Sequence, residues 1–376
     1  MSNLDPEVQT RIRVVQPLYQ RLSLILLGVV ALFFVMYVAK PIAAPLLFAL
    51  LLAILLDPVV KFLTRLRLPR VIGITLAVLI SMAALIGLGY FIGTQAMHFG
   101  ETMPELKSKL LEMGEKAQGW VQDTAHVKAS EVDDAVDKVK EESMQKGGAL
   151  VGQTLATVGT LFGFLFLLPV FTFLIILYKE LFLTFLSKLF PRRDHDALDD
   201  VLGQTKGVVQ SYLIGLLFEA VIVASLSFLA LFLIGVRYAL LLAVLAAVLN
   251  LIPYIGMMVA TFLPMLIALA TKDASAALWV LGAYAAVQFI DNNFIVPMVV
   301  ASRVQINALM SIIVVMIGGA MWGIPGMFLA IPMTAIIKVI FDGVPDLEPF
   351  GYLLGGGNGK KERDQGKKSD KPQPTH

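Results

Sequence analysis

The residues best suited to chemistry are acids and amides that interrupt apolar stretches in the C-terminal half of the chain. Gln288, Asp291 and Asn292 are spaced so that a helix would carry them on one face. Two amides beside a carboxylate offer oxygen ligands to a cation or a polyol. The same groups can equally join neighbouring helices by hydrogen bonds. We favour a binding role, because an ionisable residue at the centre of a membrane costs about 2.5–3.5 kcal/mol on insertion scales and commonly marks a site.

Glu219 is a second acid within an apolar run, at residues 208–234. Ser211, Tyr212 and Gly215 precede it on the same predicted helix face. Glu219 is therefore a candidate carrier of a proton or a cation. A hydrogen-bonded role at a contact between helices agrees with the sequence about as well.

Two other features limit how these acids are interpreted. Pro297 follows Asp291 closely and is expected to end the helix, which predicts that Asp291 lies near the end of its span. Asp57 ends an apolar stretch and is followed by Lys61 and Arg65. For Asp57 we therefore expect a structural role.

Several kinds of chemistry are excluded by residue types and motifs. The chain has no cysteine, so disulfides and thiolate sites are impossible. It contains neither the His-Glu-x-x-His motif of zinc proteases nor a Gly-x-x-x-x-Gly-Lys-Ser/Thr phosphate loop. No histidine falls inside an expected span; the four are His98, His126, His195 and His376. We expect no enzyme activity, no catalytic residues, no cofactor, no metal site and no nucleic-acid partner.

The elements that must position Asp291 and Glu219 are membrane helices. The 376 residues are 57% hydrophobic and 15% charged, with a mean hydropathy of +0.79. Soluble domains have roughly 45–50% apolar and about 25% charged residues. The excess is concentrated in long runs without charge, so the expected fold is all-α and polytopic in the membrane.

Charge and periodicity divide the chain into segments. Arg11 and Arg13 share the sign of the Lys61–Arg70 loop, and the positive-inside rule predicts that both regions are cytoplasmic. Alternation then puts the polar residues 98–150, with helical apolar spacing, outside the cytoplasm. The expected segments are a cytoplasmic N-terminus (1–20), N-terminal transmembrane helices (21–97), an extracytoplasmic helical segment (98–150), a transmembrane helix (151–178), a cytoplasmic amphipathic segment (179–207), a transport half with broken helices (208–345) and a disordered cytoplasmic tail (346–376).

Two of the apolar segments in the C-terminal half are interrupted by helix-breaking residues. The first, 239–270, is broken within 250–256, and the second, 307–341, within 318–326. A helix broken at membrane depth leaves backbone groups that protein or water must satisfy, and transporters use such breaks as binding sites. The residues expected to form the breaks are Asn250, Pro253, Tyr254 and Gly256 in the first and Gly318, Gly319, Gly323, Pro325, Gly326 and Pro332 in the second.

The sequence leaves the topology of these two breaks open. If both segments are re-entrant, Lys272 faces out and Arg303 faces in. If both segments cross the membrane, the two residues exchange sides. The positive-inside rule slightly favours the re-entrant arrangement, on the strength of Arg303 alone.

Four motifs of the C-terminal half resemble the autoinducer-2 exporter (AI-2E) family of bacterial membrane proteins. They are Gly235-Val-Arg-Tyr-Ala-Leu, Asn250-Leu-Ile-Pro-Tyr-Ile-Gly256, Gln288-Phe-Ile-Asp-Asn-Asn-Phe-Ile-Val-Pro297 and the Gly318-Gly…Gly323-Ile-Pro-Gly326…Ala330-Ile-Pro332 series. The resemblance implies an inner-membrane transporter of about eight transmembrane helices with both termini cytoplasmic. It also implies a homo-oligomer, with a pentamer as the expected form, and a small polar cargo such as autoinducer-2.

From these observations we expect a secondary transporter working by alternating access between the two breaks. Its expected ligands to a solute or ion are Asn250, Tyr254, Gln288, Asp291, Asn292 and Glu219. A sodium (or lithium)/proton antiporter is the first alternative, since the resemblance also covers such proteins. A non-transporting membrane scaffold, with the polar segment 98–150 as its interaction surface, is the alternative from a different class.

Overall fold

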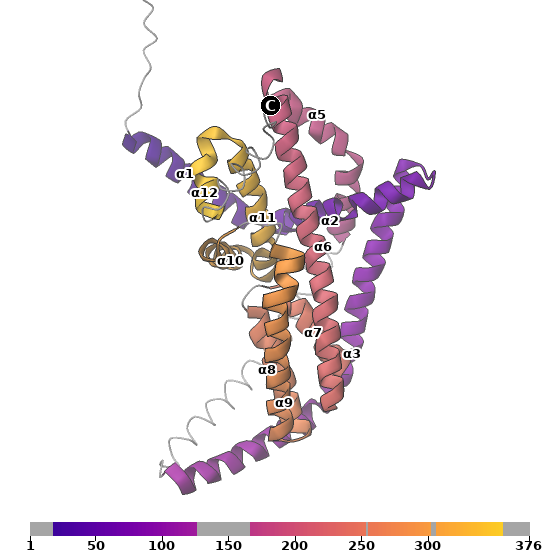
Figure 1. The fold of residues 1–376 in the computed structure, drawn as a ribbon, viewed down its shortest axis with the longest axis vertical. Helices are drawn as coiled ribbons and strands as arrows, with labels where there is room; N and C mark the ends of the chain where they lie inside the picture. Colours follow the sequence, from indigo (N-terminus) through magenta and orange to yellow (C-terminus); the bar gives the residue numbers. More distant parts are fainter. Residues whose placement is uncertain (1–17, 126–165, 253–254, 302–305, 356–376) are drawn as a thin grey trace, which may run out of the picture. The chain divides into compact units, whose positions relative to one another are not determined.

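The computed structural model describes residues 18–125, 166–252, 255–301 and 306–355, and every element in these ranges is a helix (Figure 1). Five of the helices are long and apolar enough to cross a membrane, or six if one bent pair counts as a span. Shorter apolar helices include Ala239–Asn250, Ala260–Thr271 and Ala308–Trp322. The expectation of an all-α polytopic membrane protein is confirmed.

The chain divides into two compact units. The first, Met1–Ala43, contains α1 (Leu18–Val38), a 21-residue helix with a strongly apolar sequence. The second, Ala44–His376, contains all the residues discussed below, so the two units are described separately.

The second unit begins with a helical hairpin. Helix α2 (Lys40–Arg65) turns at Arg67, which has a φ of 66°, into α3 (Arg70–Ala125). Small and branched apolar residues pack these helices against the segment Phe166–Leu177; they include Ala49, Ile74, Ala77, Leu168 and Ile176. Helix α3 has 56 residues, about 84 Å, so it continues without interruption well beyond a ~30 Å hydrocarbon core. The rest of the expected extracytoplasmic segment, and the start of the next span, lie outside the described residues.

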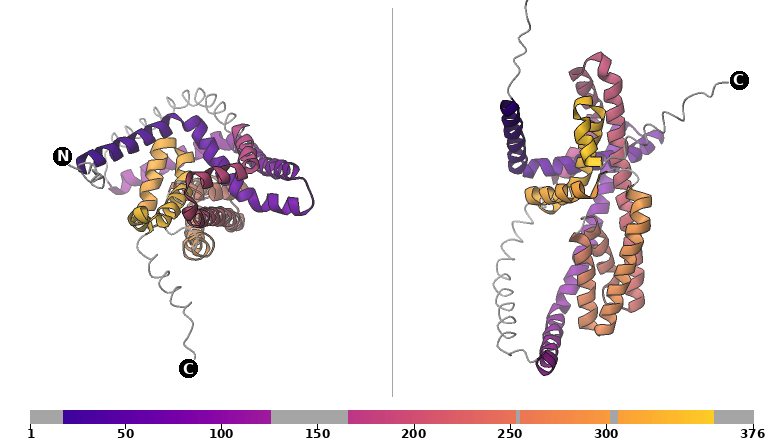
Figure 2. Two further views of the ribbon diagram at one scale, coloured as in Figure 1. Left: turned by 90° about the horizontal axis from the view of Figure 1, so that it is seen from above. Right: turned by 60° about the vertical axis from the view of Figure 1, so that its left-hand side comes forward.

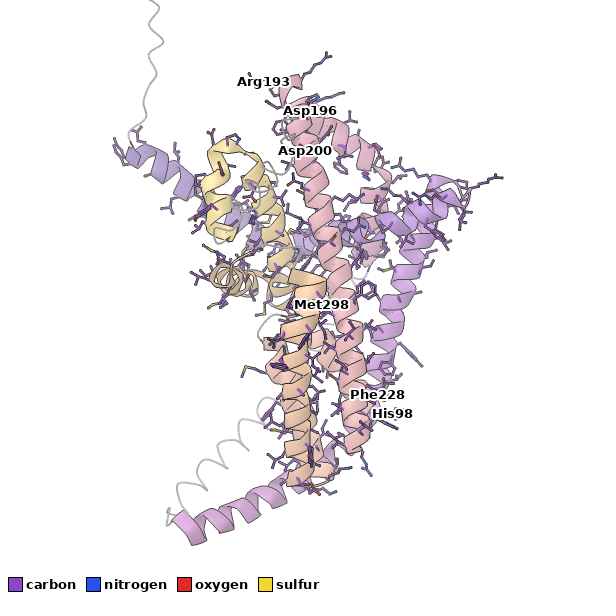
Figure 3. The ribbon with its side chains drawn as sticks, viewed as in Figure 1. His98, Arg193, Asp196, Asp200, Phe228 and Met298 are labelled. Carbon is purple, nitrogen blue, oxygen red and sulfur yellow. The ribbon has the colours of Figure 1, made fainter. Side chains whose placement is uncertain are left out.

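Helix α6 (His195–Ile234) is the long element on which the C-terminal half is assembled. The preceding segment Phe166–Leu177 bends by 61° into α5 (Lys179–Leu189), and a short turn, η1 (Arg192–Asp194), leads into α6. The sequence suggested a span starting near residue 208, whereas one continuous helix of 40 residues, about 60 Å, begins at His195. The N-terminal end of α6 carries charged residues: Figure 3 labels Asp196 and Asp200 there, with Arg193 of η1 next to them.

The first broken segment folds back on itself. Helix α6 ends at Gly235, with a φ of 73°, and α7 (Ala239–Asn250) and α8 (Ile255–Thr271) follow. The Lys272 ammonium, just after α8, donates a hydrogen bond to the Ile234 carbonyl at the end of α6. Both ends of the α7–α8 segment therefore lie at the same end of α6. This hairpin is the geometry that a re-entrant segment requires, and Gly256 permits its tight turn because a Cβ there would collide with the Leu249 carbonyl.

The second broken segment is closed by the helix that follows it. Helix α10 (Ala308–Trp322) passes through Gly323, with a φ of 69°, into α11 (Ile324–Gly343). After η3 (Pro345–Leu347), α12 (Glu348–Gly355) packs back on α11, with the rings of Phe341 and Phe350 5.8 Å apart. The Asn307 amide, before α10, donates to the Leu353 carbonyl over 2.7 Å. Gly318 of α10 lies directly against Gly326 of α11, so the α10–α11 segment is a second helical hairpin.

The two hairpins lie at opposite ends of α6. Gly343, at the end of α11, packs closely against Val201 near the N-terminus of α6, whereas Lys272 meets its C-terminus. Figure 1 shows α7, α8 and α9 beside one half of α6 and α11 and α12 beside the other, and Figure 2 shows this grouping from two further directions. The positive-inside rule, applied to Arg303, predicts the side of the membrane on which the second segment begins. Arg303 lies outside the described residues.

Helix α9 (Ala274–Ile290) connects the two hairpins and continues as a π-helix, η2 (Asp291–Ala301). It begins at Asp273, whose carboxylate accepts the Ala276 backbone N–H at 2.7 Å. This backbone hydrogen bond lowers the pKa of Asp273 below its usual value. Pro297 does not end the helix, because the wider π-helical turns carry the chain past it to Ala301.

We predict that positions 237 and 272 are accessible from the same side of the membrane, because the α7–α8 hairpin returns to where it starts. The natural absence of cysteine makes Arg237→Cys and Lys272→Cys clean sites for a membrane-impermeant thiol reagent. Arg193→Cys, at the other end of α6, is the control and should react only from the opposite side. Labelling of 237 and 272 from opposite sides would show instead that the segment crosses.

We predict that Gly326→Ala lowers the free energy of unfolding by about 1–3 kcal/mol, the usual cost of overpacking. A Cβ at this position would collide with the Gly318 carbonyl across the α10–α11 contact. Gly282→Ala in α9 is the matched control, since its Cβ would meet nothing within 4 Å. Thermal or denaturant unfolding in detergent measures both; equal behaviour of the two variants would contradict the close contact.

Candidate functional site

Three polar side chains from three elements meet at the centre of the C-terminal half. The Asn250 amide nitrogen donates to Glu219 Oε1 at 3.0 Å and to Asp291 Oδ2 at 3.1 Å. Glu219 is 5% exposed and Asp291 is 2% exposed. One amide thus joins two buried carboxylates, and we call Glu219, Asn250 and Asp291 the amide–carboxylate cluster.

The position of each residue in the amide–carboxylate cluster follows from the helix that carries it. Glu219 lies 15 residues, about 23 Å, before the end of α6, which is well inside a ~30 Å hydrocarbon core. Asn250 is the last residue of α7, so the break in the first hairpin brings its amide to the level of Glu219. Asp291 is the residue at which α9 changes from α-helical to π-helical geometry. Such transitions are frequent at functional sites.

The position of Asp291 differs from the expectation that it would lie near the end of its span. That expectation depended on Pro297 as a helix end, and the π-helical continuation removes this limit. Asp291 shares its hydrogen-bond donor with Glu219 and is therefore at the same depth in the protein.

Of the remaining predicted ligands, Gln288 lies beside the Asp291 carboxyl, at the edge of the cluster, and Asn292 lies outside it. Gln288 donates to Asn292 Oδ1 at 3.0 Å, and the Asn292 side chain is exposed. The predicted face of three ligands therefore divides: Asp291 is turned into the protein, Asn292 is exposed, and Gln288 lies between them, close to both. Pro253 and Tyr254 lie outside the described residues.

The residues predicted to shape the second break form a close helical contact. Gly318 packs against Gly326 and Ala330, and Gly319 packs against Met327. Gly323 provides the left-handed backbone of the turn, and Pro325 stands in the first turn of α11, where its missing N–H is not needed. Pro332 is fully buried in the same helix. These residues form a tight turn and contribute no polar group to the cluster.

Two buried hydroxyl residues near the cluster were missed by the sequence analysis. Ser227 lies eight residues after Glu219 on α6, and Tyr284 lies seven residues before Asp291 on α9, so each shares a helix face with its acid. Their hydroxyl groups are close enough to interact, although neither makes a hydrogen bond of ordinary geometry within the described residues. Helical spacing from the two acids was the signal that would have found them.

The chemistry available to the cluster is binding and proton exchange. Two carboxylates in a low-dielectric environment need a proton, a cation or a strong donor to compensate their charge. Among the described residues no group of three or more metal-ligating side chains is found, and the cluster contains no nucleophile or histidine base. The arrangement therefore suits a reversible ligand.

The chain matches one family of transporters and several relatives named as transport proteins or permeases. Residues 26–346 match the family model described as AI-2E family transporter. The chain is 28% identical to "Putative transport protein MT0215" of Mycobacterium tuberculosis, covering 86% of this chain and 90% of that protein. It is 28% identical to "Putative permease PerM" of Escherichia coli K12, covering 86% and 93%. It is also 23% identical to "AI-2 transport protein TqsA" of the same strain, covering 84% and 90%.

We predict that Asn250→Ala lowers the free energy of unfolding by about 1–3 kcal/mol, because two buried carboxylates lose their shared donor. Combining it with Glu219→Gln should cost less than the sum of the single changes, since the groups act together. Asn293→Ala is the control: its amide donates only to the Phe289 carbonyl on an exposed face. Additive effects in the double variant would contradict a coupled cluster.

Proposed function

The chain belongs to the AI-2E transporter family, and from that premise we propose that it is a secondary transporter which exports a small polar solute, such as autoinducer-2, by alternating access. The observation that carries this proposal is the buried amide–carboxylate cluster. Burying a carboxylate in a membrane protein costs free energy unless a ligand, a proton or a hydrogen-bond donor compensates its charge. The name of the relative TqsA supports this class of cargo.

The proposed mechanism uses the two helical hairpins as opposing gates. One hairpin reaches the cluster from the C-terminal end of α6, and the other contacts α6 near its N-terminal end. Movement of α7–α8 would displace Asn250 from Glu219 and Asp291, because Asn250 is the last residue before its turn. Cargo binding and opening of that side would then be linked. Discontinuous helices around a midplane site are a common plan for such transport.

A second candidate function is sodium (or lithium)/proton antiport. The specific observation in its favour is the pairing of two carboxylates on one amide, since a monovalent cation and a proton can compensate the same charge in turn. Ser227 lies about 12 Å along α6 from Glu219, and its hydroxyl is close to that of Tyr284 on α9, so the two would provide polar groups between the cluster and one side of the membrane.

The proposal includes a location and an assembly. We propose a bacterial inner membrane with both termini in the cytoplasm, supported by the positive residues around the turn from α2 to α3, which are Lys61, Arg65, Arg67 and Arg70. We also propose a homo-oligomer, with the pentamer taken from the family resemblance.

We predict that Glu219→Gln and Asp291→Asn each reduce cargo flux at least about tenfold at unchanged expression, because each removes a charge that the cargo must meet. Purified protein in proteoliposomes, loaded with autoinducer-2 or exposed to sodium and lithium gradients with a pH-sensitive dye, measures the two functions separately. Asp346→Asn, an exposed acid in η3, is the control and should retain full flux.

The outcomes separate the candidates. Solute flux without ion-driven proton movement supports export, and proton movement driven by sodium or lithium supports antiport. Full activity in both Glu219→Gln and Asp291→Asn would remove the cluster from the mechanism. Absence of every flux, with the protein intact, would leave the scaffold role.

A further inference from the structure

A second charged cluster, outside the transport site, surrounds Asp57. The Asp57 carboxylate lies 3.2 Å from the ammonium groups of Lys61 and Lys179 and 2.5 Å from that of Lys206. The three lysines come from α2, the start of α5 and α6. One carboxylate therefore joins three helices, and it carries a single negative charge against three positive charges.

The excess of positive charge is accessible. Asp57 is only 15% exposed in its side chain, whereas the side chains of Lys61, Lys179 and Lys206 are 61%, 36% and 33% exposed. A structural ion pair needs one cation, so two positive charges are left over at this junction. Arg70 is also close by: it contacts the Ile176 carbonyl at 3.5 Å and Glu180 at 3.9 Å.

The cluster lies where a lipid headgroup would be. Lys206 precedes Glu219 by 13 residues on α6, about 20 Å, a distance that carries it from the buried cluster out of a ~30 Å hydrocarbon core. Lys179 follows directly on the bend that ends the segment Phe166–Leu177. Long lysine side chains at such positions extend toward the interface.

Helix α5 has the character of a helix lying on a membrane surface. It has no buried residue, and it leaves the preceding helix at 61°. Its exposed apolar side chains recur at helical spacing, and they are Leu181, Phe182, Phe185 and Leu189. Lys179 and Lys188 lie at its two ends. An amphipathic helix with basic residues binds the interface of membranes that contain anionic lipid.

We propose that the junction of Asp57, Lys61, Lys179 and Lys206 binds the phosphate of an anionic phospholipid, with the apolar side of α5 against its acyl chains. The charge of the junction indicates which ligand binds there. The lipid phosphate neutralises the positive charge of the lysines that the single Asp57 carboxylate leaves uncompensated. The acyl chains cover the apolar side chains that the protein leaves exposed. Basic pockets between membrane helices bind anionic headgroups in this way.

The test is a lipid titration of the full-length protein in detergent. Dioctanoyl phosphatidylglycerol should raise the midpoint of thermal unfolding, because a ligand that binds only the folded state stabilises it. Dioctanoyl phosphatidylcholine should not raise it. In Lys61→Gln/Lys179→Gln, half-saturation should need about 25-fold more phosphatidylglycerol, or about fivefold for each lysine. The effect should weaken as salt increases.

The control variant is Arg192→Gln/Arg193→Gln, which removes the same charge from exposed positions of η1, outside α5, and should shift half-saturation less than about threefold. An equal loss of phosphatidylglycerol affinity in this control would show that the lipid is attracted by the general surface charge and not by the junction, and it would overturn the proposal. Equal stabilisation by phosphatidylcholine, or by inorganic phosphate alone, would also overturn it. So would a shift that follows protein concentration instead of lipid, since a second copy would then cover α5. The comparison of the two lipids on the unaltered protein stands even if a variant fails to fold.

Discussion

The structure depends on one constraint: polar groups within the hydrocarbon core must find partners inside the protein, since lipid offers none. Glu219 and Asp291 meet this constraint through the single amide of Asn250. That amide is available at the right depth only because α7 stops at Asn250 after 12 residues. The broken helix and the paired acids therefore depend on each other. The break in one segment places the Asn250 amide where it can donate to the acids of two other helices.

The same constraint explains the small residues at the turns. Each hairpin turns inside apolar surroundings, so its backbone must pack on itself closely enough to leave no polar group facing lipid. Gly256 lies against the Leu249 carbonyl and Gly326 against that of Gly318. At Gly323 the positive φ adds a conformational reason for glycine. The opposite locations of the hairpins along α6 then follow from two short folded-back segments joined by one long helix, α9 with its continuation η2.

The sequence predicts the elements better than it predicts their partners. Helical spacing and breakers identified Glu219, Asn250 and Asp291 individually, and all three meet in the structure. The pairing of Glu219 with Asp291 was not predictable, because periodicity tells which face a residue occupies and not which helix that face meets. Asp291 was expected near an interface because proline usually ends an α-helix, and a π-helix does not obey that expectation. The early start of α6 was missed because its charged first turns have the composition of a surface segment.

The hydrogen-bonding inventory of Asn250 has a consequence for the kind of molecule the cluster can accept. An asparagine amide has two N–H hydrogens, and those of Asn250 are both directed at carboxylate oxygens. What remains around them is almost entirely acceptor: the second oxygen of each acid and the amide oxygen itself. An incoming molecule must therefore supply the donors or the positive charge. A hydroxyl-rich solute, a proton or a bare cation satisfies that demand, and an anion does not.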